Sequence, residues 1–265
     1  MEVSNYLNKL SSLEKLLNTL DISKEVNAVS KFKGGESEAK KHLYDFLANK
    51  LDQYHNLSND PTKDYISHLS PYLHFGQISP LLIALEAKEK YSAGLDDFLE
   101  QLIIRRELSF NFVYYNENYD GELKKILPNW AYTTLEEHKD DKREFIYSKE
   151  EFEKAKTHDK YWNASQKELL ETGKIHNYMR MYWGKKILEW SKTPQKAYET
   201  ALYLNNKYAL DGRDPNSYAG IAWCFGKHDR AWKERQVYGK TRYMNANGLE
   251  RKFEMKNYLQ RKLLK

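Results

Sequence analysis

Residues 157–190 read THDKYWNASQKELLETGKIHNYMRMYWGKKILEW, and this stretch decides the fold class of the chain. It predicts one helix at about 162–172 and a second at about 176–191. Trp183 and Trp190 are seven residues apart in the second helix, so their rings leave the same face about 10 Å apart along its axis. From spacing alone, two core tryptophans are the simplest interpretation, and electron exchange between the rings through one intermediate is the alternative.

Helical patterns continue on both sides of this stretch. Pro194 stands in the first turn of a helix predicted at 194–208. Upstream, Ser148 and Glu151 form the sequence signature of a capping box, which predicts a helix start at that point.

The first half of the chain has the same character. Apolar residues recur at steps of three and four within 43–51, which predicts an amphipathic helix. Pro80 opens a helix that stops near Gly94, another helix is expected at about 96–115, and the Asn-, Asp-, Gly- and Pro-rich residues up to Pro128 predict a loop.

No period-two alternation persists long enough to predict a strand, and no internal repeat or low-complexity linker interrupts the chain. Residues 211–223, DGRDPNSYAGIAW, are expected to be irregular. The sequence therefore predicts one all-α domain over residues 1–265, with a helical subregion at residues 1–60 left open. That subregion begins with leucines at helical spacing: Leu7, Leu10, Leu13, Leu16, Leu17 and Leu20.

Composition narrows the class of protein. The 265 residues carry a net charge of +5, which permits nucleic-acid binding without requiring it, and 14% are aromatic, which suits either flat ligands or an aromatic core. Cys224 is the only cysteine, which excludes a disulfide framework and a cysteine-based metal site and fits a reducing compartment. No apolar stretch has the length or composition of a signal peptide or of a helix that crosses a bilayer, so we expect a cytoplasmic protein. No metal is expected.

Three stretches carry a resemblance to a known family. They are ISHLSPYLHFGQIS at 66–79, the stretch at 157–190, and LDGRDPNSYAGIAW at 210–223, which is followed by HDRAWKER, GKTRYMN and RKF. In this order they resemble the class II cyclobutane pyrimidine dimer photolyases over nearly the whole chain. The resemblance implies the all-α, FAD-binding helical domain of the photolyase and cryptochrome fold, with reduced FAD as the active cofactor.

Members of that family also carry an N-terminal α/β domain that holds an antenna chromophore. This chain begins where their helical domain begins, so the resemblance implies a single catalytic domain, with the α/β antenna domain absent and no antenna chromophore on this chain. A separate chain that supplies the antenna remains open, and a monomer is expected.

The resemblance implies a set of contacts to the FAD phosphates. Hydroxyl side chains and free backbone N–H groups at a helix start suit a pyrophosphate. A plain helix N-cap followed by proline is the alternative interpretation of this segment, and Ser58 stands where the family often has arginine. The implied contacts are Tyr54, Ser67, His68, Leu69 and Ser70.

Near the flavin ring, the resemblance implies that Asn205 lies beside N5 and that Arg180 and Asp211 form a salt bridge, with Arg213 among the cofactor contacts. A neutral amide can donate a hydrogen bond to flavin N5 or accept one from it. A cation near flavin N1 and C2 favours the anionic reduced form of the flavin. A helix-end asparagine and a structural ion pair are the alternatives.

The resemblance also implies an electron relay that runs from the flavin through Trp183, Trp162 and Trp190 to solvent. Trp162, on the preceding helix, is the middle member. The indole radical cation is accessible to an excited flavin, which is why the family uses tryptophan here.

For the substrate, the resemblance implies that a pyrimidine dimer flipped out of the duplex lies against Asn177, Met181 and Trp223, with Asp229 and Arg230 lining the site and binding the DNA flank. The basic residues near the C-terminus are expected either to contact phosphates or to be a solvated tail. They are Arg235, Lys240, Arg242, Arg251, Lys252 and Lys256.

Two departures from the family concern this substrate site. Gln101 stands where many relatives have glutamate, so a hydrogen bond to the dimer is kept but a proton donor is lost. Arg105 stands where some relatives have tryptophan, so stacking on the lesion is expected to be weaker.

The expected function is the light-driven repair of cyclobutane pyrimidine dimers in ultraviolet-damaged DNA by electron transfer from excited reduced FAD, which makes the chain a deoxyribodipyrimidine photo-lyase. A cryptochrome-like flavin photoreceptor without repair activity is the second interpretation, and Gln101 and the missing antenna domain favour it. A flavin-free helical nucleic-acid-binding remnant is the third. Bound FAD separates the third interpretation from the other two.

Overall fold

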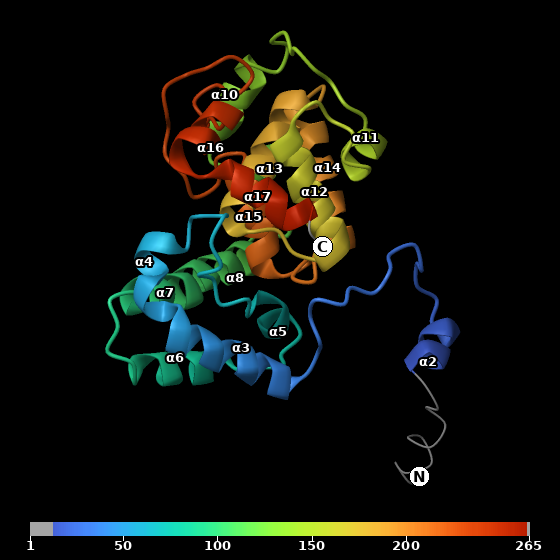
Figure 1. Ribbon diagram of the computed structural model, residues 1–265. Coiled ribbons are helices and arrows are strands. Elements are labelled where there is room, and N and C mark those ends of the chain that lie inside the picture. Colours follow the sequence, from blue (N-terminus) through green and yellow to red (C-terminus); the bar gives the residue numbers. More distant parts are fainter. Residues whose placement is uncertain (1–12, 264–265) are drawn as a thin grey trace.

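The computed structural model describes residues 13–263, which are largely helical (Figure 1). Within these residues there is no strand, only one isolated bridge between Arg235 and Gly239. The all-α prediction is therefore confirmed, while the predicted helical spacing at Leu7 and Leu10 lies outside the described residues. The elements are α2 (Leu13–Thr19), α3 (Glu36–Asn49), η1 (Leu51–Gln53), α4 (Tyr54–Leu57), α5 (Ser70–His74), α6 (Pro80–Lys88), α7 (Leu95–Leu99), the π-helical η2 (Glu100–Arg105), α8 (Arg106–Tyr115), α9 (Leu123–Ile126), α10 (Asn129–Glu137), α11 (Lys149–Glu153), α12 (Lys160–Thr172), α13 (Asn177–Trp190), α14 (Pro194–Tyr208), α15 (Pro215–Trp223), α16 (Ala246–Lys252) and α17 (Met255–Leu263).

The helices pack around two hydrophobic clusters. The larger cluster runs in sequence from Phe112 to Tyr258 and includes buried residues of α12, α13, α14 and α15. The smaller runs from Ala39 to Leu102, around α3, α5, α6 and α7. α8 follows the smaller cluster and packs along α15, which joins the two (Figure 1). Among the described helices, none has the length and apolarity that crossing a membrane requires.

Local sequence signals set several helix starts. The Ser148 hydroxyl accepts a hydrogen bond from the Glu151 backbone N–H at 3.2 Å, and the Glu151 carboxylate accepts one from the Ser148 backbone N–H at 2.8 Å. The predicted capping box is therefore confirmed. Pro80 and Pro194 each stand in the first turn of a helix, as predicted.

Two loop predictions were wrong. Residues 211–223, expected to be irregular, contain α15, which begins after Asp214, whose carboxylate accepts the Asn216 backbone N–H at 2.9 Å. The loop expected before Pro128 contains the single turn α9. Both helices are short and bury apolar side chains in the larger cluster, so packing stabilises them where local periodicity is too brief to predict them.

The helix predicted at 96–115 exists, but it is not regular. α7, the π-helical stretch η2 and α8 follow one another without a break. π-helical turns widen the backbone and are often found at functional sites. Gln101 and Arg105 both belong to this stretch.

Candidate functional site

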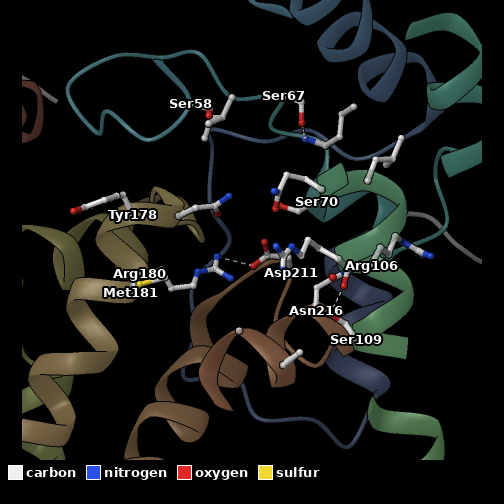
Figure 2. Close-up of a pocket in the computed structure, with 18 of the residues that line it drawn as sticks. Ser58, Ser67, Ser70, Arg106, Ser109, Tyr178, Arg180, Met181, Asp211 and Asn216 are labelled. Carbon is white, nitrogen blue, oxygen red and sulfur yellow. Dashed lines mark hydrogen bonds and ion pairs between the residues drawn. The ribbon is translucent and has the colours of Figure 1, made fainter. Parts of the chain in front are cut away.

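A cavity of about 670 Å³ lies where the two clusters meet. Residues from α4, α5 and η2 line one side of it, and residues from α13 and α15 line the other. Its volume falls in the range of about 300–1,000 Å³ that is usual for ligand pockets. Figure 2 shows Ser70, Asp211 and Arg180 next to one another among the residues that line the cavity. The predicted site residues that line it are Tyr54, Ser67, His68, Leu69, Ser70, Gln101, Arg105, Asn177, Arg180, Met181, Asp211 and Trp223.

Arg180 and Asp211 form an ion pair inside this cavity. The Arg180 Nη2 donates to Asp211 Oδ1 at 2.9 Å, and the two side chains are 15% and 10% exposed. Burial raises the pKa of Asp211, but the neighbouring Arg180 and Lys174 outweigh burial and lower this pKa to about 2. The carboxylate is therefore charged at neutral pH, and the pair predicted between α13 and the residues before α15 is present.

Lys174 is a cavity residue that sequence reasoning missed. Its side chain is buried, its ammonium donates to the Ser70 hydroxyl at 2.7 Å, and it forms no ion pair among residues 13–263. Burial lowers the pKa of Lys174 to about 8. The residue lies in the quoted stretch at 157–190, directly after Gly173 ends α12, but nothing in its spacing indicates burial.

The turn before α5 is held in a strained conformation. His68 has φ +56°, in the left-handed region that a non-glycine residue seldom adopts. Its Nε2 lies 2.6 Å from Asp64 Oδ1, and burial lowers the pKa of His68. Because no side chain caps the start of α5, the hydroxyls of Ser67 and Ser70 are not used as simple helix caps there.

Several features of the cavity fit a flat cofactor with a phosphate end. Arg180 Nε is buried without a hydrogen-bond partner in the described chain, so a ligand oxygen could accept from it. His68 Nδ1 is buried without a partner as well; because the neutral ring donates from Nε2 to Asp64, Nδ1 is an acceptor that a ligand hydroxyl could satisfy. Lys174 offers a buried positive charge beside Ser70. Gly220 lines the cavity, and a Cβ added there would meet nothing within 4 Å, which leaves open space against α15. The residues present therefore fit FAD.

Tyr54 is held firmly at the edge of the cavity. Its ring meets those of Phe46 and Phe98 edge-on, at centroid distances of 5.6 and 5.7 Å. Burial raises the pKa of Tyr54 to about 12, so its hydroxyl stays protonated and can donate to a ligand. Ser58 also lines the cavity.

Two predicted cofactor residues do not line the cavity. Asn205 is buried, and its amide donates to the Ser217 hydroxyl at 2.6 Å, so Ser217 lies between it and the cavity. Arg213 is exposed, with φ +64°, and its backbone N–H donates to the Asn206 side chain at 3.1 Å.

On the side of η2, the predicted lesion residues come together. The Arg105 guanidinium lies 5.1 Å from the centroid of the Trp223 ring, a cation–π contact, and its Nε lies 3.2 Å from Glu100. Met181 lines the same cavity and receives a contact from Arg242 Nη1 at 3.6 Å.

Asp229 and Arg230 lie outside the cavity lining, in a turn next to it. The Arg230 guanidinium stacks on Trp232 at 4.9 Å, and the Trp232 indole N–H donates to Asp229 at 3.3 Å. Arg242 stacks on Trp232 as well, at 5.2 Å, and Arg242 lines the cavity, so the turn adjoins the rim.

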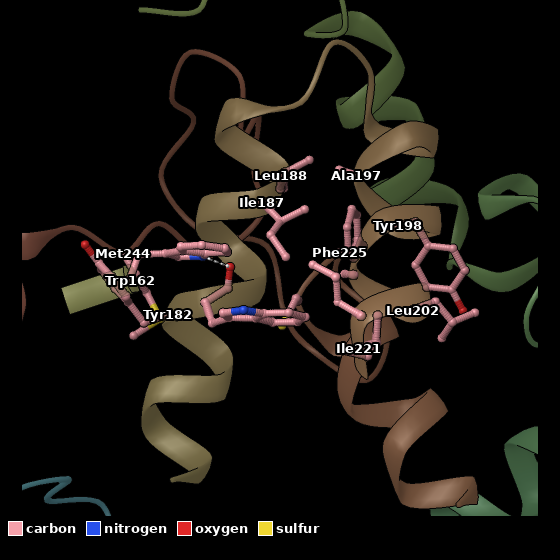
Figure 3. Close-up of a cluster of buried hydrophobic side chains, with 14 of the residues drawn as sticks. Trp162, Tyr182, Ile187, Leu188, Ala197, Tyr198, Leu202, Ile221, Phe225 and Met244 are labelled. Carbon is pink, nitrogen blue, oxygen red and sulfur yellow. Dashed lines mark hydrogen bonds between the residues drawn. The ribbon is translucent and has the colours of Figure 1, made fainter. Parts of the chain in front are cut away.

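The three predicted relay tryptophans form one continuous chain. Trp162 stacks on Trp183 with centroids 6.3 Å apart and an interplanar angle of 4°, and it meets Trp190 edge-on at 6.2 Å. Figure 3 shows Trp162 in the same buried cluster as Tyr182 and Ile187 of α13. The ring of the middle member thus bridges two rings that α13 alone would hold two turns apart.

The indole N–H groups of the first two rings are tied to neutral acceptors. Trp162 Nε1 donates to the backbone carbonyl of Trp183 at 3.0 Å, and Trp183 Nε1 donates to Gln166 Oε1 at 2.8 Å. Trp183 itself does not line the cavity; Arg180 and Met181, about one turn earlier in the same helix, do.

The chain is similar to proteins named deoxyribodipyrimidine photo-lyase. It is 56% identical to that of Methanothermobacter thermautotrophicus over 232 residues, which is 88% of this chain and 51% of the relative. It is 52% identical to that of Oryza sativa subsp. japonica over 219 residues, 81% of this chain and 43% of the relative. The chain thus spans about half the length of the curated relatives it matches. No protein-family model matches it.

Solved structures share the fold at low sequence identity. A Synechocystis sp. PCC6803 cryptochrome aligns with a TM-score of 0.69 and 18% identity over 91% of this chain and 48% of that protein. An archaeal photolyase from Sulfolobus tokodaii, solved with two FAD molecules, aligns with a TM-score of 0.61 and 19% identity over 96% of this chain and 51% of that protein. The helical fold is therefore that of the FAD-binding domain of photolyases and cryptochromes, as predicted.

Proposed function

We propose that this chain is the FAD-binding catalytic domain of a class II deoxyribodipyrimidine photolyase, which repairs cyclobutane pyrimidine dimers with light. The observation that carries the proposal is the continuous stack of three buried tryptophans, which begins about one helical turn from a cavity that fits a dinucleotide. The 52–56% identity to photolyases from two distant organisms supports it.

The residues proposed to hold FAD divide into two groups. Ser67 and Ser70 at the start of α5, with Lys174, offer hydroxyl donors and a buried cation to the phosphates. Arg180 and Asp211 lie toward the ring end, where the guanidinium stabilises negative charge on the ligand. When bound, FAD supplies a light-absorbing one-electron donor.

The ion pair orients Arg180 as well as neutralising it. Since Asp211 accepts the hydrogen bond of the Arg180 Nη2 group, the unpartnered Arg180 Nε remains the donor that the ligand can use.

Asn205 is proposed to contact the ligand after its side-chain amide turns away from the Ser217 hydroxyl, to which it now donates. The amide and the hydroxyl can each donate and accept, so each can form a new hydrogen bond.

The tryptophans are proposed to refill the donor. An electron passes from Trp190 to Trp162 and then to Trp183, towards the cavity, through rings that are 6.2 and 6.3 Å apart. The buried, apolar surroundings keep the rings fixed and exclude water from the path.

The dimer is proposed to bind between η2 and α15. A photolyase must take the damaged bases out of the stack, and Trp223 offers a flat apolar wall while Asn177 and Gln101 offer amide groups to the base edges. Arg242 and Lys252, which line the cavity, are proposed to pair with phosphates of the flank. The amide of Gln101 can bond a thymine carbonyl but cannot protonate it.

A flavin photoreceptor without repair activity is the second candidate function. Gln101, an amide on the cavity wall where the resemblance expects a carboxylic acid, is the observation that favours it. Both candidates use the same cofactor cavity and tryptophan chain, so only dimer repair separates them.

The experiment combines flavin binding with repair. The purified chain is mixed with excess FAD, freed of unbound flavin and tested for absorbance, and then for dimer loss from irradiated oligonucleotide under blue light with reduced FAD. We expect about one FAD per chain and light-dependent repair. Asp211→Asn should reduce the flavin content, whereas the matched change of an exposed aspartate, Asp21→Asn, should not. Bound flavin without any repair would select the photoreceptor, and no bound flavin would refute both candidates.

A further inference from the structure

A second cavity, of about 510 Å³, lies at the opposite end of α13 from the first. Trp190 lines it although this side chain is only 4% exposed, whereas neither Trp162 nor Trp183 does. A small molecule in this cavity therefore has direct access to the last ring of the tryptophan chain. The walls come from four further parts of the chain, at residues 142–145, 158–159, 235–238, and 243 with 245–247.

The cavity wall carries cations that have no carboxylate partner. Lys142, Arg143 and Arg235 line it, and none of the three forms an ion pair within residues 13–263. The Arg143 Nη1 donates to the backbone carbonyls of Lys139 and Asp141, at 2.8 and 3.0 Å. Its Nε and Nη2 are buried without a hydrogen-bond partner in the described chain, so a polar group that reached this guanidinium would satisfy an unmet need for acceptors.

The acidic groups of the wall are mostly engaged. Asp159 accepts two backbone N–H groups at the start of α12 and a tyrosine hydroxyl. Glu189 pairs with Lys186 and accepts the Tyr238 hydroxyl at 3.0 Å. Glu144, the third acid, is exposed. Asp159 and Glu189 are engaged in these contacts, whereas Lys142, Arg143 and Arg235 form no ion pair in the described residues, so the cavity favours an anion.

The wall is built to hold its shape. Val237 has φ +65°, an outlier for a β-branched residue, and its backbone N–H donates to Asp141 Oδ2 at 2.7 Å. Gln236 Nε2 donates to the Lys142 carbonyl at 3.0 Å. Strained backbone persists where its surroundings fix it, often at ligand sites, and here it fixes the turn that carries Arg235 against the loop that carries Arg143.

Trp190 differs from the other two rings of the chain. Its indole N–H makes no hydrogen bond within the described residues, whereas those of Trp162 and Trp183 do. The Lys186 ammonium lies 5.4 Å from the Trp190 centroid and disfavours positive charge on the ring. Lys186 is already paired with Glu189, and an anion in the cavity would add further negative charge that stabilises a positive hole on Trp190.

We propose that this second cavity binds a small organic monoanion of the enediolate class, which acts as a one-electron reductant of Trp190. The reducing role rests on the proposed function, but the anion site does not. When Trp190 has lost an electron to Trp162 it is a radical cation, and the bound enediolate gives it one electron. Trp190 returns to its neutral form, the enediolate becomes a radical anion, and the proton that it sheds leaves through the cavity to solvent.

The site itself is tested first, in the dark and without flavin. Ascorbate is titrated calorimetrically into the flavin-free protein under nitrogen. We expect saturable binding that weakens with added salt and is weaker by about tenfold or more in R143Q/R235Q, because each lost charge-assisted hydrogen bond counts for about that factor. Lys41→Gln, which removes an exposed lysine of α3 far along the chain from the cavity, should bind ascorbate like the original protein.

The reductant role is tested with light on the FAD-loaded protein. The rate of photoreduction should saturate with ascorbate concentration in the original chain and rise only linearly in R143Q/R235Q. With neutral β-mercaptoethanol the two should behave alike, since the relay is intact. Arg235→Gln alone serves where the double variant is less stable, because the Arg235 side chain makes no hydrogen bond within the described residues.

The possible results separate the two proposals. No binding heat at millimolar ascorbate in low salt, or equal binding by R143Q/R235Q and the original chain, overturns the site. Saturable binding with linear photoreduction in both proteins overturns the reductant role. If ascorbate binds and FAD does not, the proposed function fails while the anion site stands.

Discussion

Replacing Lys174 with methionine should make the empty protein more stable and the cofactor bind less tightly. The fold lowers the pKa of Lys174 from 10.5 to about 8 by burial. At about 1.4 kcal/mol per pKa unit, this difference corresponds to a charging penalty of about 3 kcal/mol. Methionine has a similar length and carries no charge, so Lys174→Met should recover up to about 3 kcal/mol of unfolding free energy at pH 7.

The gain should depend on pH in a defined direction. A buried cation destabilises the folded protein by its full charging penalty when the pH is below its pKa in the folded state. This penalty decreases as the pH rises above that value and is gone above the pKa of the same group in the unfolded chain. The difference between Lys174→Met and the original chain should therefore be largest at pH 7 and shrink from about pH 8 to pH 10.5. Because Asp211 also loses a cationic neighbour in the variant, the measured gain should be somewhat below the full penalty.

Cofactor affinity should move the opposite way. A charge-assisted hydrogen bond contributes about 1.5–3 kcal/mol, so loss of the ammonium should weaken FAD binding about 10- to 100-fold. A phosphate beside Lys174 would also raise its pKa, so FAD affinity in the original chain should fall as pH rises above 8, and that fall should be absent in the variant.

The assays are urea unfolding of the flavin-free protein and equilibrium titration with FAD. Lys88→Met, at an exposed lysine of α6 that does not line the cavity, controls for the loss of one charge. A variant that is less stable than the original at pH 7, or that binds FAD with unchanged affinity, would refute the assignment of Lys174 as a destabilising residue kept for the ligand.

Three further changes test other parts of the site. Trp183→Phe should abolish photoreduction of oxidised FAD by an external reductant but spare repair by chemically reduced protein; unchanged photoreduction would remove Trp183 from the relay. Gln101→Glu should raise the number of dimers repaired per absorbed photon, since a carboxyl group can donate a proton; an equal or lower yield would exclude that role. Gly220→Leu should keep the fold, gaining up to about 1 kcal/mol of helix propensity, while FAD content falls because the side chain enters the cavity; full FAD content would contradict the proposal that FAD fills the cavity beside Gly220.

The sequence predicted the helices that have local start signals or a long apolar period. The capping box at Ser148 and the prolines at 80 and 194 are examples, because each acts within one turn of the chain. The tryptophan spacing likewise predicted two rings on one face of α13. The position of Trp162 between them came from the resemblance, because it depends on how α12 packs against α13.

What escaped prediction depends on contacts between distant parts of the chain. α15 is too short for its period to be recognised and is stabilised by packing on α8. Lys174 is ordinary in sequence, and only the approach of Ser70, 104 residues away, makes it a buried cavity residue. The π-helical stretch at 100–105 leaves no pattern distinct from an α-helix over six residues.

The two halves of the site need different surroundings, and α13 provides both. A charged ligand needs hydrogen-bond donors that the protein leaves without a partner, such as Arg180 Nε. Such donors destabilise the protein without its ligand, and Arg180 lies in the cavity where the two hydrophobic clusters meet rather than inside either cluster. An electron path needs rings that stay fixed and dry, which only the interior of the larger cluster offers, where Trp183 sits. α13 carries Arg180 towards the cavity and Trp183 into the larger cluster. We therefore expect the destabilising polar groups around Arg180 to have little effect on the packing of the tryptophan rings. A substitution that loosens α5 should therefore reduce cofactor binding long before it alters the stacking of Trp162 on Trp183.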